Sequence, residues 1–358
     1  MELSELGWDS FFEEGFLQYK DDGLIPARTG REDRGQYLLF SAGGELTGEV
    51  SGRFRHEAGD KEEFPAVGDW VAADVLPAEH RATIHAVLPR RSGFVRKAPG
   101  GRTEGQIVAA NVDTAFIVNG LDGGRNFNLR RTERYMALAW ESGAEPVIVL
   151  NKADVCPDVE ARVREAEAVA SGVPVYPVSA LTGQGLDLLH RHMVSGQTAC
   201  FIGSSGVGKS ALINSLLGTE RQAVNTLRKG DLQGRHTTTR RELIVLPGKG
   251  IVIDTPGMRE LQMWGDEDSV SHTFADIEEL AARCRFRDCK HQGEPGCAVQ
   301  LAIGQGSLDA GRFESYLRLQ REMAHLARRQ DNRARLAEKA KWKKIAQWSK
   351  EHYKERGP

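Results

Sequence analysis

The strongest constraint on the fold is a glycine-rich run, Gly203 to Ser210, which matches G-x-x-x-x-G-K-[ST]. It follows a short apolar, strand-type run and precedes a helix-type segment, residues 210–217. This context is typical of a phosphate-binding loop, where glycines let backbone N–H groups turn toward phosphates and the helix presents its positive end. Lys209 would bridge the β- and γ-phosphates, and Ser210 would bind Mg2+. The sequence therefore predicts a nucleotide site on a P-loop α/β domain.

A second motif, Asn151 to Asp154, also follows an apolar run and indicates which base is bound. The Asp154 carboxylate can accept two hydrogen bonds from guanine N1–H and N2–H2, a pair of donors that adenine lacks. Asn151 would reach N7, and the stem of Lys152 would cover the base. Further on, Ser179 and Ala180 resemble the loop that closes over guanine O6. Since an unpaired buried polar group rejects the wrong base strongly, we expect GTP.

Two further segments suit the γ-phosphate end of such a site. A polar stretch from Gly234 to Thr239 has the composition of a switch loop, in which Thr239, with Thr238 as second choice, would bind Mg2+. The next strand-type run ends in a D-T-P-G motif, where Asp254 would hold Mg2+ through water and the Gly257 amide would contact the γ-phosphate. A surface turn is the alternative for the first segment, but its place between the P-loop and D-T-P-G favours a switch.

The order of the motifs is unusual, because the base-reading motifs at 151 and 179 precede the P-loop at 203. In the common arrangement they follow it, so the same sheet requires a chain that enters at a different point. The sequence thus predicts a circularly permuted G domain, with its switch segments near the exit to whatever follows. Met258 follows Gly257 where many GTPases carry a water-orienting glutamine, so slow intrinsic hydrolysis is expected. His236 is the candidate substitute, with a structural or exposed histidine as an equal alternative.

These motifs define one predicted nucleotide site. Its candidate catalytic residues are Lys209, His236 and Thr239, and its Mg2+ ligands are Ser210 and Thr239. The candidate nucleotide contacts are Asn151, Lys152, Ala153, Asp154, Ser179, Ala180, Gly203, Ser204, Ser205, Gly206, Val207, Gly208, Lys209, Ser210, Ala211, Asp254 and Gly257.

A cysteine cluster near the C-terminal end predicts a metal site. Cys284, Cys289, His291 and Cys297 offer three thiols and an imidazole within a short stretch. Such a set fills all four positions of tetrahedral Zn2+, which is typical of a structural site. Chance clustering or a disulfide are the alternatives, and five cysteines in 358 residues argue against a disulfide scaffold and for a reducing compartment.

The rest of the chain divides into segments that differ in composition and in hydrophobic pattern. Residues 1–33 form an acidic, aromatic lead-in, and residues 34–100 contain short β-type runs that predict an OB-type barrel, with any small β-domain as the alternative. From 101 to 264, apolar strand-type runs alternate with helix-type segments, which predicts a mostly parallel sheet. Residues 265–358 hold the cysteine cluster and are predicted to be mostly helical.

Charge and hydropathy favour some classes of protein and disfavour others. The net charge is −2, but the residues from Arg312 onward contain 14 Lys/Arg and 6 Asp/Glu. A basic tail favours contact with a polyanion such as nucleic acid, and a solvated helix is the alternative. The mean hydropathy is −0.43, and neither a membrane-spanning run nor a secretory signal is apparent. A soluble, cytoplasmic monomer is expected.

Together, the permuted order, G-R-H-T-T-T, D-T-P-G and the cysteine spacing resemble the RsgA family of ribosome small-subunit-dependent GTPases along essentially the whole chain. The run Leu88-Pro89-Arg90-Arg91-Ser92 resembles that family's barrel-to-G-domain junction. The resemblance implies an N-terminal OB barrel, a permuted GTPase and a C-terminal zinc domain. It also implies a late maturation factor of the small (30S) ribosomal subunit that contacts 16S rRNA and other assembly factors, with hydrolysis stimulated by the subunit.

Two other functions fit some of these features. A metal-delivery GTPase would also combine a P-loop with Cys/His ligands, but it needs a labile metal site, whereas this set of four is saturated. A GTP-binding RNA scaffold without turnover is consistent with Met258.

Overall fold

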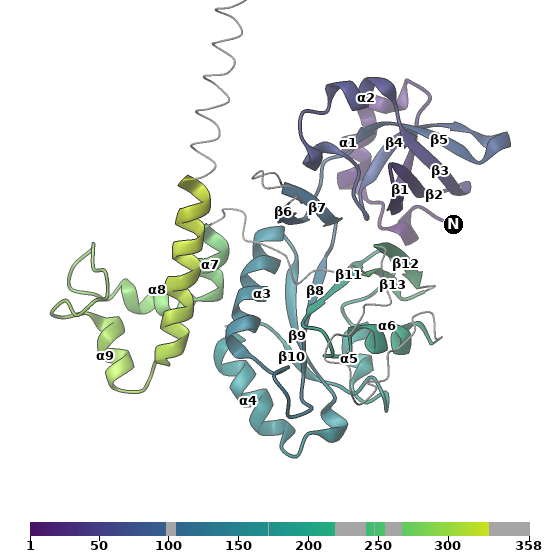
Figure 1. Cartoon of the computed structure of the whole chain (residues 1–358). Helices are drawn as coiled ribbons and strands as arrows, with labels where there is room; N and C mark the ends of the chain where they lie inside the picture. The colour runs from purple at the N-terminus through teal and green to yellow at the C-terminus, as the bar shows by residue number, and fades with distance from the viewer. Residues whose placement is uncertain (98–104, 171, 219–240, 247, 255–266, 329–358) are drawn as a thin grey trace, which may run out of the picture.

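The computed structural model of the chain describes residues 1–97, 105–170, 172–218, 241–246, 248–254 and 267–328. Along the chain it contains a lead-in, a barrel, a helix-covered sheet and a group of helices, shown in Figure 1. His236, Thr239, Gly257 and Met258 lie outside the described residues, as does the basic tail beyond Arg328.

The lead-in consists of a 3-10 turn, η1 (Ser4–Leu6), and a helix, α1 (Ser10–Lys20). Asp9 caps α1, because its side chain accepts hydrogen bonds from the N–H groups of Phe11 and Phe12. The aromatic side chains that mark this segment in the sequence include rings that pack against the barrel. The Trp8 ring lies edge-on to Trp70, with centroids 4.7 Å apart.

The barrel is closed and has the strand order β1-β2-β3-β5-β4. The strands are β1 (Ile25–Asp33), β2 (Gln36–Ser41), β3 (Gly44–Val50), β4 (Trp70–Leu76) and β5 (Arg81–Val87). The intervening helical segments are α2 (Gly52–Glu57), η2 (Lys61–Glu63) and η3 (Pro77–Glu79). The expected N-terminal barrel is therefore present, with five strands.

The first strand differs from the sequence-based boundary, which placed residues 1–33 ahead of the barrel. β1 pairs with both β2 and β4 and so closes the barrel. Its sequence, IPARTGRED, lacks the alternation of apolar and polar residues that marks a half-buried strand. It is nevertheless buried at its centre, where Arg28 is only 1 % exposed. The sequence did not predict this strand, because arginine is usually exposed and Arg28 gives no sign in the sequence that it is buried.

A two-stranded hairpin, β6 (Gly93–Lys97) and β7 (Gly105–Ala110), leads from the barrel to the larger sheet. The expected domain boundary after residue 100 falls between these paired strands. A boundary drawn at a glycine-rich break thus separates two strands that hydrogen-bond to each other.

The central sheet has six strands in the order β10-β9-β8-β11-β13-β12. Its strands are β8 (Thr114–Gly120), β9 (Glu145–Asn151), β10 (Val175–Pro177), β11 (Thr198–Gly203), β12 (Glu242–Leu246) and β13 (Gly250–Asp254). All neighbouring pairs are parallel except β12 with β13. The apolar strand-type runs of this part of the sequence correspond to β8, β9, β10, β11 and β13.

Helices cover both faces of this sheet, as Figure 1 shows. The helices are α3 (Leu129–Ser142), α4 (Val159–Ala170), α5 (Leu186–His190) and α6 (Lys209–Leu217), with the turn η4 (Ala153–Val155) between β9 and α4. Alternate residues of β8 belong to different cores: Ile117 packs with residues of α3 and α4, and Phe116 with residues of α5 and α6. All seven residues of β8 are therefore buried, as in parallel sheets generally.

The C-terminal unit contains α7 (Glu267–Thr273), α8 (Ala275–Ala281), α9 (Ala298–Gly304) and a helix over residues 310–328. It packs against α3, where the rings of Trp140 and His272 lie 5.7 Å apart. The predicted mostly helical character is confirmed for these residues. None of the helices that the structure describes is both long and apolar enough to cross a membrane.

Candidate functional site

The predicted nucleotide-binding residues gather at the carboxyl edge of the parallel sheet. In the register of the strands, Gly203 at the end of β11 lies opposite Val118, and Asn151 at the end of β9 lies opposite Gly120. Asp254 ends the adjacent strand β13 at the same edge. Open α/β sheets bind ligands outside the carboxyl ends of their strands, so this is where a site is expected.

The P-loop connects β11 to α6 and depends on glycine at two close approaches. A Cβ on Gly203 would lie 2.5 Å from the Val118 carbonyl oxygen, and one on Gly208 would lie 2.2 Å from Asn151 Nδ2. Gly208 also has φ +97°, which favours glycine. Lys209 Nζ donates to the carbonyls of Gly203 (2.8 Å) and Ser204 (2.7 Å), so the lysine lies along the loop.

Asn151 joins three of the predicted segments. Its Nδ2 donates to the Val207 carbonyl in the P-loop (2.8 Å), and its Oδ1 accepts from the Ala180 N–H (3.0 Å). The Asn151 side chain is buried, and Ser215 Oγ of α6 donates to the Ala180 carbonyl (2.7 Å). Both ends of the Asn151 amide thus contact backbone, which fixes the two loops relative to each other.

Lys152 contacts the P-loop and a carboxylate, Asp122, that the motifs do not include. Its backbone is left-handed (φ 67°), and its Nζ donates to the Gly206 carbonyl (2.6 Å) and pairs with Asp122 (2.5 Å). Partial burial opposes ionisation of Asp122, but the hydrogen bond and charge of Lys152 lower its pKa below the ordinary value. Arg131, at the start of α3, donates to the Ser204 hydroxyl of the P-loop.

Sequence reasoning missed Asp122 and Arg131, because neither belongs to a short motif. Asp122 follows the end of β8, and Arg131 lies in the first turn of the next helix. Their position after a central strand, at the edge where the other site residues gather, is the signal that would have indicated them.

A hollow of about 670 Å3 lies between these loops, within the size range of ligand pockets. Its lining consists of Asn151, Lys152, Asp154, Val155, Ala180, Leu181, Gly208, Ala211, Asn214, Ser215 and Gly218. The Leu181 side chain is 85 % exposed and Val155 is 60 % exposed. Apolar side chains left open to solvent beside one carboxylate, Asp154, can cover the faces of a flat base while its edge is recognised.

The remaining predicted nucleotide contacts that the structure describes belong to the same loops, or to the turns and helix that follow them. Ala153 and Asp154 form η4 directly after β9, and Ser179 is fully buried, with its hydroxyl accepting from Thr182 N (3.1 Å). Ser205 is exposed on the P-loop, and Ser210 and Ala211 are in the first turn of α6. Gly257, His236 and Thr239 fall outside the described residues.

The predicted metal ligands form a compact cluster. One ligand atom from each of Cys284, Cys289, His291 and Cys297 lies within 4.8 Å of all the others. His291 Nδ1 is 3.4 Å from Cys297 Sγ and 3.6 Å from Cys284 Sγ. With zinc–sulfur bonds of about 2.3 Å, tetrahedral ligands stand roughly 3.8 Å apart, so the donor set fits one Zn2+.

Local structure orients these ligands. Cys297 is the N-cap of α9, and its sulfur accepts from the Gln300 N–H (3.4 Å). The Gln300 side chain donates to the His291 carbonyl (2.7 Å), and His291 itself has a left-handed backbone (φ 58°). Cys156 and Cys200 lie outside the cluster, and all five cysteines are free.

Sequence comparison connects this architecture to a known family. Residues 87–264 match the family model described as RsgA GTPase. The chain is 49 % identical over 356 residues to the small ribosomal subunit biogenesis GTPase RsgA of Opitutus terrae, covering 97 % of this chain and 96 % of the relative. It is 44 % identical to the protein of the same description from Syntrophotalea carbinolica, covering 98 % and 99 %.

Solved structures agree with this relationship. YjeQ from Thermotoga maritima superposes with a TM-score of 0.62 at 26 % identity, covering 84 % of this chain and 99 % of that one. YloQ, described as a circularly permuted GTPase, has the same fold, with a TM-score of 0.60 at 24 % identity and coverage of 84 % and 96 %. The expected order, in which the base-reading strands β9 and β10 precede the P-loop strand, is thus that of a permuted G domain. The chain belongs to the RsgA family of circularly permuted GTPases.

Proposed function

We propose that this chain hydrolyses GTP and acts in the biogenesis of the small ribosomal subunit, with turnover stimulated by that subunit. The relatives that it matches along nearly their whole length carry that description. The structural observation that carries the proposal is the hollow at the carboxyl edge of the sheet, where Asn151 joins the P-loop to the loop of Ala180. A cytoplasmic location and contact with 16S rRNA and other assembly factors follow from this role.

The hollow would hold guanine. Asp154 would accept from N1–H and N2–H2, and the exposed side chains of Leu181 and Val155 would cover the base. Asn151 would position the two loops through both ends of its amide. Its Nδ2 carries a second N–H, which would reach N7 as the motif predicts.

The phosphates would lie along the P-loop. Lys209 would exchange its contacts with the loop carbonyls for the β- and γ-phosphates, and α6 would present its positive N-terminus. Ser210 and Asp254, with Thr239, provide the hydroxyl and carboxylate oxygens that suit Mg2+, which neutralises charge on the phosphates when bound. His236 would orient the attacking water, and Gly257 would contact the γ-phosphate.

The cysteine cluster would hold one structural Zn2+. Three cysteines and one histidine fill a tetrahedral shell and leave no open position for a substrate. This arrangement supports a fixed C-terminal unit rather than a site that hands a metal to another protein.

The first test measures GTP hydrolysis by the full chain with and without isolated small ribosomal subunits, using ATP as the control nucleotide. Strong stimulation confined to GTP is expected. Turnover that stays slow with subunits present would contradict the ribosomal part of the proposal and leave the nucleotide site intact.

The base-reading role is tested by Asp154→Asn. An asparagine amide donates where the carboxylate accepted, so GTP affinity should fall by about 100-fold or more. Xanthosine triphosphate, with a carbonyl where guanine has its 2-amino group, should bind better than GTP. Asp158→Asn is the matched control, because Asp158 lies outside the hollow and caps α4 through a contact that asparagine can make. Unchanged GTP affinity in Asp154→Asn would contradict the assignment.

A further inference from the structure

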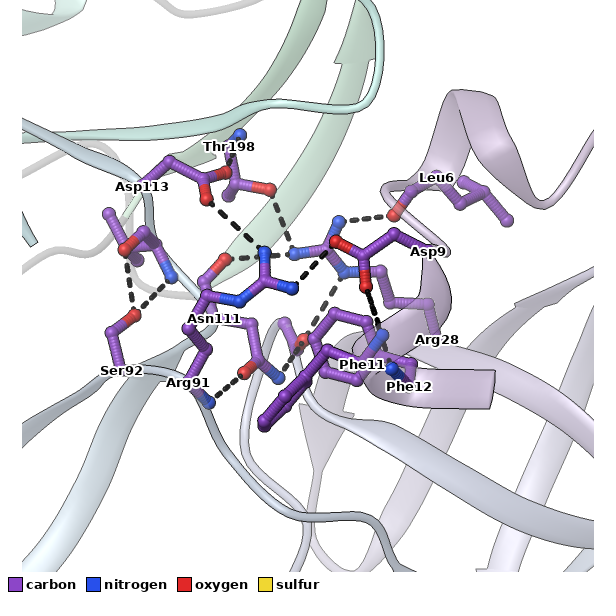
Figure 2. A network of polar contacts seen from close by, with 12 residues as sticks. Leu6, Asp9, Phe11, Phe12, Arg28, Arg91, Ser92, Asn111, Asp113 and Thr198 are labelled. Carbon is purple, nitrogen blue, oxygen red and sulfur yellow. Dashed lines mark hydrogen bonds and ion pairs between the residues drawn. The ribbon is translucent and has the colours of Figure 1, made fainter. Parts of the chain in front are cut away.

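The lead-in, the barrel and the G domain meet in a network of polar contacts (Figure 2). The network includes Thr198 at the start of β11, whereas the P-loop follows the other end of that strand. We propose that this network is an interdomain clamp that couples the barrel to the P-loop through β11, and that subunit-stimulated turnover requires it while basal turnover does not. The clamp consists of Leu6, Gly7, Asp9, Arg28, Arg91, Asn111, Asp113, Gly196 and Thr198. The proposal rests on the GTPase function proposed above.

Arg28 of β1 is the centre of the clamp. Its guanidinium donates to the Leu6 carbonyl of the lead-in, to the Asn111 carbonyl (3.1 Å) and to the Thr198 hydroxyl (2.8 Å). Its Nε donates to the Gly68 carbonyl (3.2 Å) within the barrel. One buried side chain therefore connects the lead-in, the barrel, the β7–β8 connection and the first residue of β11.

Arg91 makes a second connection. Its guanidinium pairs with Asp9 (2.6 Å) and lies 3.9 Å from Asp113, and it covers the ring of Phe12. Asp113 in turn accepts from the Thr198 N–H (2.7 Å). Thr198 is thus held by its hydroxyl through Arg28 and by its backbone through Asp113.

The backbones also meet directly. A Cβ on Gly7 would lie 2.5 Å from the Gly196 carbonyl oxygen, and a Cβ on Gly196 would lie 2.8 Å from the Ser4 carbonyl oxygen. Both glycines have positive φ. The lead-in therefore lies against the loop that enters β11, at a distance that no larger residue permits.

Thr198 connects the clamp to the nucleotide site, because it begins the strand that ends at the P-loop. β11 begins at Thr198 and ends at Gly203, the first residue of the P-loop, about 16 Å away at strand geometry. β11 lies between β8 and β13 in the middle of the sheet and pairs with both, so we expect it to shift as a unit. A force on the barrel therefore reaches the base of the strand that carries the phosphate-binding loop.

The lead-in is what completes this connection, because it supplies Leu6, Gly7 and Asp9. It also packs on the barrel through Trp8 and Trp70. Its role is to hold the barrel in one orientation on the G domain. Its acidic residue Asp9 pairs with Arg91, and its aromatic residue Trp8 packs on the barrel.

The test uses Asp9→Asn in the full chain, with Glu14→Gln as control. Asparagine still caps α1 but removes the charge that pairs with Arg91, while Glu14 is an exposed acid on the same helix. Basal turnover, KM for GTP, affinity for the small subunit and turnover at saturating subunit are measured for both variants and the unmodified chain. Arg91→Gln and the double variant complete a mutant cycle.

We expect Asp9→Asn to lower the subunit-saturated kcat by about 5-fold or more, with basal kcat and KM unchanged. Glu14→Gln should match the unmodified chain, and the double variant should lose little more than Asp9→Asn alone. An unchanged stimulated kcat in Asp9→Asn, or equal loss of basal and stimulated kcat, would overturn the clamp. Absence of stimulation in the unmodified chain would instead overturn the proposed subunit dependence, and the clamp's role with it.

Discussion

Each of the two units that pack against the G domain contributes a buried arginine, and the two arginines have different partners. Arg28, on β1 of the barrel, contacts three carbonyls and a hydroxyl. Arg312, on the helix over residues 310–328, contacts two carbonyls, both oxygens of Asp276 (2.7 and 2.8 Å) and Glu133 (3.0 Å). They are 1 % and 3 % exposed, so burial alone does not distinguish them.

The partners decide the electrostatics. Burial lowers the pKa of Arg28 to about 10, and the carboxylates of Asp113 and Asp69 oppose the change without cancelling it. Burial also opposes the charge of Arg312, but the hydrogen bonds and charges of Asp276 and Glu133 raise its pKa. On the barrel side a buried charge is thus held by neutral dipoles, and on the C-terminal side a buried charge is held by one buried and one partly exposed carboxylate. Removing one member has different consequences in each case.

Loss of the metal should give the largest difference between the C-terminal unit and the barrel. Zinc binding in small zinc domains is worth about 10–16 kcal/mol at pH 7, so its loss should release the C-terminal unit. Cys284→Ser should lower zinc content and raise hydrogen exchange in residues 284–304, with no change in α1 or β1. Cys156→Ser, outside the cluster, is the control. Full zinc content in Cys284→Ser would contradict the four-ligand assignment.

Arg312→Met should give the next largest effect. It leaves Glu133, which is fully buried, without its second cationic partner, and breaking buried pairs in this way costs about 3–5 kcal/mol. Urea denaturation should show the loss, with faster hydrogen exchange in residues 310–328. Arg318→Met, exposed on the same helix, should be nearly neutral. Equal stability of the two variants would mean that the network contributes little.

Arg28→Met should have the smallest effect of the three on stability, about 1–3 kcal/mol. It leaves neutral acceptors rather than a buried carboxylate that has lost one of its two cationic partners, and Asn111 still donates to the Gly68 carbonyl (3.1 Å). Faster hydrogen exchange should appear in α1 and β1 and spare residues 310–328. A loss larger than that of Arg312→Met would reverse the comparison between the two sides.

Local sequence was enough for the parts of the site whose chemistry depends on neighbours in the chain. The P-loop requires glycines, a lysine and a helix in succession, so Gly203 to Ser210 indicated it directly. The cysteine cluster is similar, because its four ligands lie between residues 284 and 297. The strands β8, β9, β11 and β13 were predictable because each is a short apolar run between turn-forming or helical segments.

Other features depend on residues that are far apart in sequence. β1 was assigned to the lead-in because Arg28 looks exposed until Thr198, 170 residues away, provides its partner. Arg312 and Glu133, separated by 179 residues, gave no signal for the same reason. The sequence did not predict that both ends of the Asn151 amide contact backbone either. The Val207 carbonyl and the Ala180 N–H, which are its partners, belong to two other loops.

The sequence by itself determined the family, the permuted order of the sheet, the GTP-binding motifs and the metal-ligand set. The groups of each motif are close together in the chain, so covalent spacing fixes their chemistry, and the order of the motifs along the chain gives the permutation. Only the tertiary structure decided how the barrel and the C-terminal unit are held on the G domain. Those contacts join buried arginines to distant carbonyls and carboxylates, and burial, which makes such contacts strong, exists only once the chain has folded.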